Sequence, residues 1–368
     1  MRIALEDGFS IQKGTGIGQH TLNLYHQLQS YPEIESVELI TKPIISLIQP
    51  SIIRRICYIG WINSVLQLHL RQKKVDIIHF TNNLIPACRH SKAKYVVTIH
   101  DMTPWRFPET LPNRYRSYIT RAIKNALQKS DLVLTVSEAI KNEILSECQI
   151  NQAKIVTAYN GIAHKFWEQP KKNYEASNQL RNQLGIKKDF ILSVGVIEDR
   201  KNILTLLNAF EKARMHMDLQ LVLVGRPGYG SAKVLKRLSS DALKNEVILP
   251  GYLSLDELIT IYDNASLFVY PSLYEGFGIP LLEAMVREIP IVASRIPSTL
   301  EIARDAANYF DNPLDDNSLA DRIIETLGNK KLLETMVQKG KERVKDFTWD
   351  KVGLMYLNAY KNIFQRSY

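Results

Sequence analysis

Short runs of β-branched and other apolar residues alternate with longer amphipathic segments along the whole chain. The short runs have the length of buried strands, and the longer segments repeat their apolar residues with helical spacing. Such alternation is typical of βαβ units, in which helices cover both faces of a parallel sheet. We expect strands at residues 2–5, 37–40, 77–80, 95–99, 132–136 and 154–158 in the first half, and at 190–196, 219–224, 247–249, 267–270, 290–293 and 308–310 in the second.

The length of 368 residues exceeds what one hydrophobic core usually supports, so the pattern predicts two α/β domains. We place the first at residues 1–167 and the second at 188–348. Residues 168–187 are polar and show no clear period, which indicates a linker. A last amphipathic helix is expected at 349–368, with Thr348 as its N-cap. Its apolar stripe consists of Val352, Met355, Ala359 and Ile363.

The segment 50–74 combines several isoleucines with a group of Arg and Lys residues. One interpretation is a pair of helices that cover the sheet and bury their apolar side in the core. The other is an amphipathic segment that lies on a membrane surface. The sequence favours the first interpretation without excluding the second.

The overall composition, 45% hydrophobic and 23% charged, is that of an ordinary globular protein. No run approaches the roughly 18 to 20 apolar residues of a membrane span, and the acidic pair Glu6 and Asp7 interrupts any signal peptide. We therefore expect a cytoplasmic protein. Cys57, Cys88 and Cys148 are scattered, which is typical of reduced thiols and not of a disulfide framework or a zinc site.

The positive charge is concentrated in the first half of the chain. Residues 1–165 hold 20 Lys and Arg against 12 Asp and Glu, whereas residues 166–368 hold 27 against 26. A basic domain suits a phosphorylated substrate, the anionic inner face of the plasma membrane or nucleic acid. Nucleic acid is the weakest of these, because no recognisable nucleic-acid module or Arg-rich tract is present. A solubility bias without any partner remains an alternative.

The stretch 274–283, Tyr-Glu-Gly-Phe-Gly-Ile-Pro-Leu-Leu-Glu, carries the most informative candidate chemistry. It follows an expected strand, and Pro280 suits the start of a helix. The glycines let backbone N–H groups approach an anion, and the helix dipole adds to that attraction. The stretch therefore predicts a phosphate site, with Glu275 and Glu283 placed to accept hydrogen bonds from hydroxyl groups. The amide-bearing candidates are Gly276, Phe277, Gly278 and Ile279.

A second anion site is expected where the strand at 190–196 ends. Gly195 allows a tight exit from that strand, and Arg200 and Lys201 place two cations beside the next helix. Asn202 is a candidate N-cap for this helix. Two adjacent cations at a strand end fit a diphosphate.

The first half offers a glycine loop and a strand-end histidine. Gly14, Gly16 and Gly18 precede a helix. A dinucleotide fingerprint, G-x-G-x-x-G, would need a glycine at position 19, where the chain has Gln19. It would also need a strand directly before the loop, and none is expected there. The loop can still approach a sugar or phosphate. His100 ends the strand at 95–99, where it can bind a sugar hydroxyl or phosphate; the alternative is a structural histidine anchored by Asp101.

Three further residues follow strands of the second half. Arg226 is a candidate nucleotide contact, although a plain turn fits the same residues. Tyr252 and Leu253 come after the strand that begins at Val247 and suit a loop that contacts a base.

Together, the stretch 274–283, Gly195 with Arg200 to Asn202, the loop 14–18 and His100-Asp101 resemble the successive motifs of retaining glycosyltransferases of family 4. The resemblance spans nearly the whole chain, and in detail it is to the bacterial mannosyltransferase B-like branch that builds surface polysaccharide. It implies the GT-B fold, in which two doubly wound Rossmann-like domains face a cleft and a C-terminal helix crosses back to the first domain.

The resemblance also implies roles. Glu283 would hold the ribose, Arg200 and Lys201 would neutralise the diphosphate, and Glu275 with the amides of 276–278 would hold the transferred sugar. His100 is counted with the catalytic candidates, and the glycines of the loop 14–18 with the donor-binding ones. Retention without a covalent intermediate, in which the departing phosphate oxygen takes the acceptor proton, belongs to the same implication.

The function implied is transfer of a hexose, mannose favoured, from a nucleotide sugar to a glycan or lipid-linked acceptor. A GDP-sugar is favoured, and UDP- or dTDP-sugars remain open. No cofactor is implied because the nucleotide sugar is a substrate, and the chain holds no Asp-x-Asp pair to seat a metal ion. The alternatives are an epimerase or hydrolase of sugar nucleotides on the same fold, which needs its own acid and base, and a binding module, which leaves the paired glutamates without a purpose.

Overall fold

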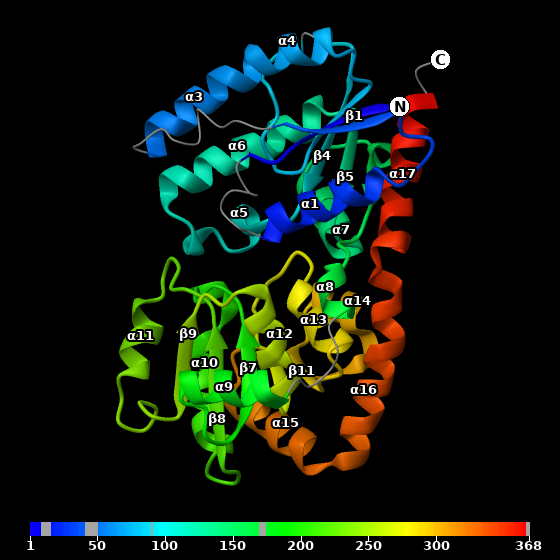
Figure 1. Ribbon diagram of the computed structural model, residues 1–368. Helices are drawn as coiled ribbons and strands as arrows, with labels where there is room; N and C mark the ends of the chain where they lie inside the picture. Colours follow the sequence, from blue (N-terminus) through cyan, green and yellow to red (C-terminus); the bar gives the residue numbers. More distant parts are fainter. Residues whose placement is uncertain (9–15, 41–50, 90, 169–173, 366–368) are drawn as a thin grey trace. The chain divides into compact units, whose positions relative to one another are not determined.

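The chain forms two compact units in a computed structural model that describes residues 1–8, 16–40, 51–89, 91–168 and 174–365 (Figure 1). Unit 1 comprises Met1–Trp105, Asn113–Ala163 and Thr348–Tyr368. Unit 2 comprises Arg106–Pro112 and His164–Phe347. Each unit is built on its own parallel sheet, as the alternation of strands and helices predicts.

The sheet of unit 1 has six strands in the order β2-β1-β3-β4-β5-β6, and every neighbouring pair is parallel. The chain reverses its direction of winding between β1 and β3, so the sheet is doubly wound. The strands are β1 (Arg2–Glu6), β2 (Ser36–Leu39), β3 (Ile77–Phe80), β4 (Lys94–Ile99), β5 (Leu132–Thr135) and β6 (Ile155–Thr157). The helices are α1 (Gly16–Leu28), α3 (Ser51–Asn63), α4 (Val65–Gln72), α5 (Thr103–Arg106), α6 (Asn113–Lys129), α7 (Glu138–Glu147) and α17 (Trp349–Gln365).

Unit 2 carries a second six-stranded parallel sheet, in the order β12-β11-β10-β7-β8-β9. Here the winding reverses between β7 and β10. The strands are β7 (Asp189–Val194), β8 (Leu219–Val224), β9 (Val247–Gly251), β10 (Leu267–Tyr270), β11 (Ile291–Ser294) and β12 (Ala307–Phe310). The helices are α8 (His164–Glu168), α9 (Tyr174–Leu184), α10 (Ile203–Ala213), α11 (Ala232–Leu238), α12 (Leu255–Asn264), α13 (Ile279–Val286), α14 (Pro297–Ala303), α15 (Asp316–Gly328) and α16 (Lys330–Val344).

Every strand expected from the apolar runs is present, and the strand ends differ from the expected ones by a residue or two where they differ at all. The segment 168–187 was expected to be a linker without a period, but it contains the helix α9. Leu180 of that helix is buried, and Asn264 of α12 donates a hydrogen bond from Nδ2 to Ser177 Oγ at 2.9 Å. The polar composition that suggested a linker belongs to the exposed side of a surface helix.

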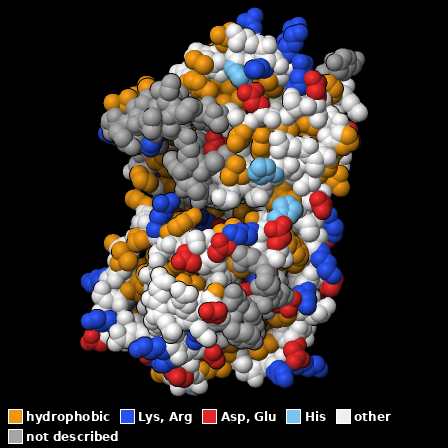
Figure 2. Space-filling model, in the orientation of Figure 1, with side chains coloured by type: hydrophobic (Ala, Val, Ile, Leu, Met, Phe, Trp, Pro, Cys, Tyr) orange, Lys and Arg blue, Asp and Glu red, His pale blue; other side chains and the backbone are white. Residues whose placement is uncertain are grey.

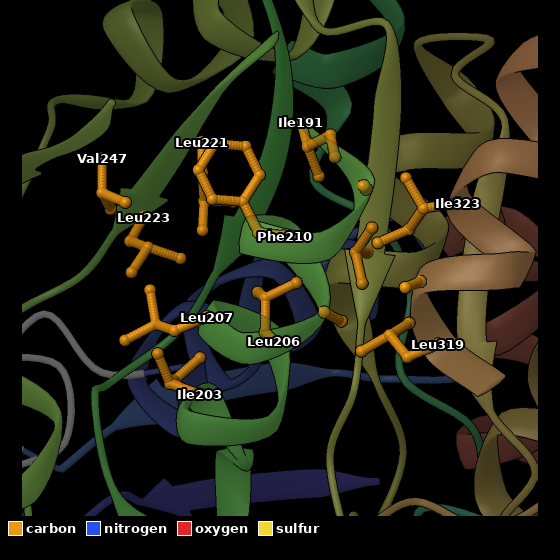
Figure 3. Close-up of a cluster of buried hydrophobic side chains, with 14 of the residues drawn as sticks. Ile191, Ile203, Leu206, Leu207, Phe210, Leu221, Leu223, Val247, Leu319 and Ile323 are labelled. Carbon is orange, nitrogen blue, oxygen red and sulfur yellow. The ribbon is translucent and has the colours of Figure 1, made fainter. Parts of the chain in front are cut away.

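Each sheet is covered by apolar helix faces. In unit 2, Leu206, Leu207 and Phe210 of α10 pack with strand residues such as Leu221 and with α15 (Figure 3). Charged side chains of both signs are mixed over the face of this unit in Figure 2, as the near-balance of charge in the second half predicts.

The core of unit 1 includes the final helix, α17. Val352, Ala359 and Ile363 are buried and Met355 packs against the same core, which confirms the expected stripe. The helix lies against α1, and its two buried tyrosines bond to the rest of the unit. Tyr356 Oη donates to the Ala158 carbonyl at 3.2 Å, and Tyr360 Oη lies 2.7 Å from His79 Nδ1. The last helix therefore completes the first domain, as the GT-B resemblance implies.

Helices α3 and α4 form the pair expected in the segment 50–74. Tyr58, Ile62, Leu66 and Leu70 are buried, which confirms that one side of the pair covers the sheet. Several other apolar residues of the pair remain exposed, namely Ile53, Ile56, Ile59, Val65 and Leu68.

Candidate functional site in unit 2

The reversal of strand order between β7 and β10 positions the candidate site. In open parallel sheets, ligands bind at the carboxyl ends of the strands where the winding reverses. The 3₁₀ turn η3 (Asp199–Lys201) follows β7, and the loop 271–278 follows β10. Leu273 N donates to the Arg200 carbonyl at 2.9 Å, which ties the two loops together. Residues that lie far apart in the sequence thus meet at one point of the sheet.

Glu275 is held between Arg200 and Lys201. Its Oε2 accepts from Arg200 Nη1 at 2.8 Å, and its Oε1 accepts from Lys201 Nζ at 2.6 Å. The carboxylate is 9% exposed and the two cationic side chains 16% and 14%. Burial alone would raise the pKa of Glu275, but Arg200 and Lys201 outweigh it and lower this pKa to about 2. The site therefore holds an ionised carboxylate that pairs with two nearly buried cations.

Neighbouring side chains hold both cations in place. Arg200 also donates to the Tyr274 carbonyl and, through Nη2, to Glu198 Oε1 at 2.6 Å. The Lys201 ammonium lies 5.2 Å from the ring centroid of Tyr270, within the range of a cation–π contact. Such fixed cations can stabilise developing negative charge with little rearrangement.

Asn202 occupies the N-cap position of α10, but its side chain does not cap the helix. It has a left-handed backbone conformation, with φ of 56°. Its Nδ2 donates to the Pro271 carbonyl at 3.0 Å, and its Oδ1 accepts from Thr205 Oγ1 at 2.7 Å. The expected cap is therefore wrong, because this amide instead links the loop after β7 to the end of β10.

Two glycines bring the strand ends of β7 and β8 close together. Gly195 and Gly225 both have φ of 150°. A Cβ atom on Gly225 would lie 1.9 Å from the Gly195 carbonyl oxygen, and one on Gly195 would lie 3.3 Å from Lys201 Cε. Gly195 therefore forms the tight strand exit that the sequence predicts, and Gly225 is required by the backbone packed against it.

The glycine loop before α13 has the geometry of a helix N-terminus. Gly278 is the N-cap residue, with φ of 112°, and Pro280 lies in the first turn as expected. Ile279 is partly exposed there. The Phe277 ring is buried against Phe347, with centroids 5.8 Å apart, so its side chain belongs to the core. Any contact of Phe277 with a ligand would have to come from its backbone.

Glu283 lies one turn into α13. Its Oε2 accepts from Tyr262 Oη at 2.8 Å. Burial raises the pKa of Glu283 to about 7, and the bond from Tyr262 offsets part of this rise. The two glutamates of the motif therefore differ: Glu275 stays ionised, and Glu283 titrates near neutral pH.

The sequence did not point to two supports of this helix. Tyr262 lies 21 positions before Glu283, and no local pattern links them. Arg287 follows α13 and forms a buried bidentate pair with Asp263 of α12, in which each of its Nε and Nη2 atoms lies 2.6 Å from a carboxylate oxygen. Among the residues that support the site, only Glu198 could be found from the sequence, because it lies two positions before its partner Arg200.

The other candidates of unit 2 lie at the ends of β8 and β9. Arg226 is exposed, and its carbonyl accepts from Ile197 N at 3.0 Å. The side chain of Tyr252 is 78% exposed, whereas Leu253 is buried. Since β7, β8, β9 and β10 are parallel, these residues follow strands at the same sheet edge as Glu275. Tyr252 is available to a ligand there, and Leu253 is not.

The candidates of the first half belong to unit 1. Gly14 lies outside the described residues. Gly16 begins α1, where an added Cβ atom would have open space around it, and Gly18 is buried. His100 Nε2 bonds to the Thr81 carbonyl at 2.8 Å, while Asp101 Oδ1 accepts from Thr103 N. Hence His100 is anchored by Thr81 and not by Asp101; burial lowers its pKa, which keeps the imidazole neutral.

Among the residues that the structure describes, no three His, Cys, Asp or Glu side chains come together as metal ligands. In the same part of the chain, no helix combines the length and the apolar character needed to cross a bilayer. The three cysteines are free thiols.

Comparison with known proteins gives the same assignment for both halves. The family described as "Glycosyltransferase Family 4" matches residues 16–166, and "Glycosyl transferases group 1" matches residues 176–343. The chain is 30% identical over 294 residues to an O-antigen chain mannosyltransferase B of Escherichia coli, covering 79% of this chain and 76% of that protein. It is 29% identical to the O-antigen chain mannosyltransferase RfbU of Salmonella typhimurium, covering 71% and 67%.

A solved structure supports the fold. The crystal structure of Anabaena HepE in complex with UDP-glucose superposes with a TM-score of 0.75 at 17% identity, covering 99% of both chains. The two doubly wound sheets, the final helix that returns to the first domain, and the matches in both halves lead to one conclusion. This chain belongs to the group 1, family 4 glycosyltransferases and has the GT-B fold.

Proposed function

We propose that this glycosyltransferase moves a hexose, mannose in the first place, from a nucleotide-sugar donor to a glycan or lipid-linked acceptor in surface polysaccharide synthesis. Configuration at the anomeric carbon is retained. The observation that carries the proposal is Glu275 held between Arg200 and Lys201 where the sheet of unit 2 reverses. The relatives named as O-antigen mannosyltransferases support mannose, and with it a GDP-sugar donor.

Arg200 and Lys201 have the chemistry needed for the leaving group. When the bond between sugar and nucleotide breaks, negative charge develops on the diphosphate. Two cations at 16% and 14% exposure interact with this charge more strongly than they would in water. Because Glu198 and Tyr270 already fix them, they need little reorganisation as the charge appears.

Glu275 holds both cations before the donor arrives. A diphosphate bears acceptor oxygens of the same kind and competes for the same N–H groups. We propose that the donor takes over these cations and that Glu275 then accepts a hydrogen bond from a hydroxyl of the transferred sugar. The N–H groups of 276–278 and the N-terminus of α13 support phosphate binding beside it.

Glu283 and His100 complete the proposed contacts. Glu283, when ionised, accepts hydrogen bonds from the ribose hydroxyls. Because its Nε2 hydrogen is donated to Thr81, His100 presents a bare Nδ1 that can accept a hydrogen bond from a hydroxyl group. Unit 1 takes the acceptor, and its basic charge suits contact with an anionic membrane surface.

Thermal unfolding with GDP, UDP, dTDP and ADP tests the proposal. A nucleotide at 100 times its Kd should stabilise the protein by about 2.7 kcal/mol, and GDP should do so at the lowest concentration. Lys201→Ala should weaken this stabilisation and lower turnover with GDP-mannose by roughly 10- to 100-fold. Lys339→Ala is the control, since Lys339 pairs with Asp305, which precedes β12 and so does not lie at the carboxyl ends of the strands.

Glu275→Gln separates binding from turnover. Loss of the competing charge should leave nucleoside diphosphate binding equal or tighter, whereas sugar transfer should fall roughly 10-fold or more. Unchanged turnover in both Lys201→Ala and Glu275→Gln, or no stabilisation by any nucleotide, would contradict the proposed function.

A further inference from the structure

A groove in unit 1 lies outside the sequence motifs. It has a volume of about 280 Å³, and its lining residues belong to α3, the segment after β3, and α6. Its lining includes the apolar side chains of Ile59, Leu84 and Ile85 and, from α6, the side chains of Arg114, Tyr118 and Arg121. We call it the α3–α6 groove. It can hold a group of mixed apolar and polar character.

The two arginines give the groove uncompensated positive charge. Arg114 and Arg121 lie seven positions apart on one helix, which places them on the same side of α6, about 10 Å apart along its axis. Both are exposed, and neither forms a hydrogen bond or ion pair with any described residue. By contrast, Arg89 of the same unit pairs with Asp131 at 2.8 Å. Guanidinium groups at a concave surface favour phosphate oxygens.

An exposed apolar stripe runs along α3 to the groove. Ile53, Ile56 and Ile59 recur every third residue and are 48%, 64% and 42% exposed. The opposite side of α3 is already in the core through Tyr58 and Ile62. Isolated apolar residues at a surface need no explanation, but three on one helix side, ending in a groove, indicate a partner with its own apolar surface.

The combination selects the kind of ligand. A free phosphate would use the arginines and leave the stripe exposed, and a nucleic acid would need stacking residues that the stripe lacks. A second copy of this chain would bring another basic first half against this one. A lipid with a phosphate headgroup matches both parts.

We propose that the α3–α6 groove binds the phosphate of a membrane lipid through Arg114 and Arg121, with the hydrocarbon chain along Ile53, Ile56 and Ile59. The lipid is the carrier of the saccharide acceptor, so this part of the inference rests on the proposed function. The site thereby holds the acceptor on the unit whose excess charge favours the anionic membrane.

Vesicle binding tests the site directly. Full-length protein is sedimented with phosphatidylcholine vesicles that contain about 10 mol% of a long-chain polyprenyl monophosphate, or phosphatidylglycerol of equal charge. The double variant Arg114→Gln/Arg121→Gln should weaken binding to the polyprenyl phosphate vesicles at least about tenfold. The control is Arg116→Gln/Lys124→Gln, which removes the same charge from α6 outside the groove and should weaken binding less than about twofold.

The stripe has its own variant. Ile53→Ser/Ile56→Ser should weaken binding to the same vesicles and leave the melting temperature unchanged, because both side chains are exposed. Equal losses in the groove and control variants, equal binding to both anionic vesicles, or full displacement by millimolar inorganic phosphate would overturn the proposal. Nucleotide stabilisation is measured in every variant: its absence in the wild-type protein refutes the proposed function, whereas vesicle binding alone decides the lipid site.

Discussion

The two sheets share a doubly wound parallel topology, yet the side chains at their reversal points differ in charge. In unit 2, that point holds Glu275 with two cations. In unit 1, the end of β1 holds the fully buried Glu6, whose Oε2 accepts from Tyr58 Oη at 2.8 Å and Asn82 Nδ2 at 3.1 Å. The topology thus sets the place of a site, and the residues at the strand ends decide whether it suits a phosphate or a neutral hydroxyl-bearing group.

The largest expected effect tests how tightly the edge of unit 2 is built. Gly225→Ala should destabilise unit 2 by about 3 kcal/mol or more, because the new Cβ would meet the Gly195 carbonyl in a backbone conformation that disfavours side chains. Gly16→Ala in unit 1 meets no atom and should change stability by less than about 1 kcal/mol. Urea denaturation monitored by hydrogen exchange measures the stability of each unit, through β7 peptides for unit 2 and β4 peptides for unit 1. Similar losses in both variants would remove this contrast.

The next effect separates the units by their response to acid. Burial lowers the pKa of His79 in unit 1 to about 3, so the unfolded chain binds its proton more tightly. Unit 1 should lose about 2 kcal/mol between pH 7 and 5 from this group alone. Glu275 affects the stability of unit 2, and at lower pH. Because its pKa is lowered, it contributes stability above about pH 4.5 that is lost as the pH falls towards 2.

Hydrogen exchange at several pH values checks these two windows. His79→Gln should flatten the loss in β3 and β4 peptides between pH 7 and 5, and Glu275→Gln should flatten the loss in β7 and β10 peptides below pH 4.5. If the stability of unit 1 in the wild-type protein does not change between pH 7 and 5, protonation of the buried His79 does not destabilise the fold.

The smallest effect distinguishes the two glutamates of unit 2. The pKa of Glu283 is raised to about 7, so deprotonation between pH 6 and 8 should make it a stronger acceptor for the ribose hydroxyls that we propose it binds. GDP affinity should therefore rise with pH by up to about tenfold, or 1.4 kcal/mol. Titration calorimetry measures GDP affinity against pH. In Glu283→Gln, the remaining change with pH comes from the phosphate groups of the nucleotide, and the difference between the wild-type and variant profiles is the contribution of Glu283. Identical pH profiles would exclude ribose binding by the ionised form.

The sequence predicted the strands well because buried parallel strands are short apolar runs, and it predicted the candidate charges because they directly follow those runs. It could not give the pairing of Arg200 and Lys201 with Glu275, which depends on β10 lying beside β7 across more than 70 residues. The helix α9 was missed because its polar side hides the period. Asn202 was misassigned because its amide bonds to residues distant in the chain.

The final helix also bears on how the protein is made. Trp349, Tyr356 and Tyr360 supply three of the largest fully buried side chains, and they pack in the core of unit 1. During synthesis, these residues leave the ribosome after all of unit 2. Unit 1 therefore acquires this core helix only after unit 2 has been synthesised, and unit 2 can finish folding before unit 1 does.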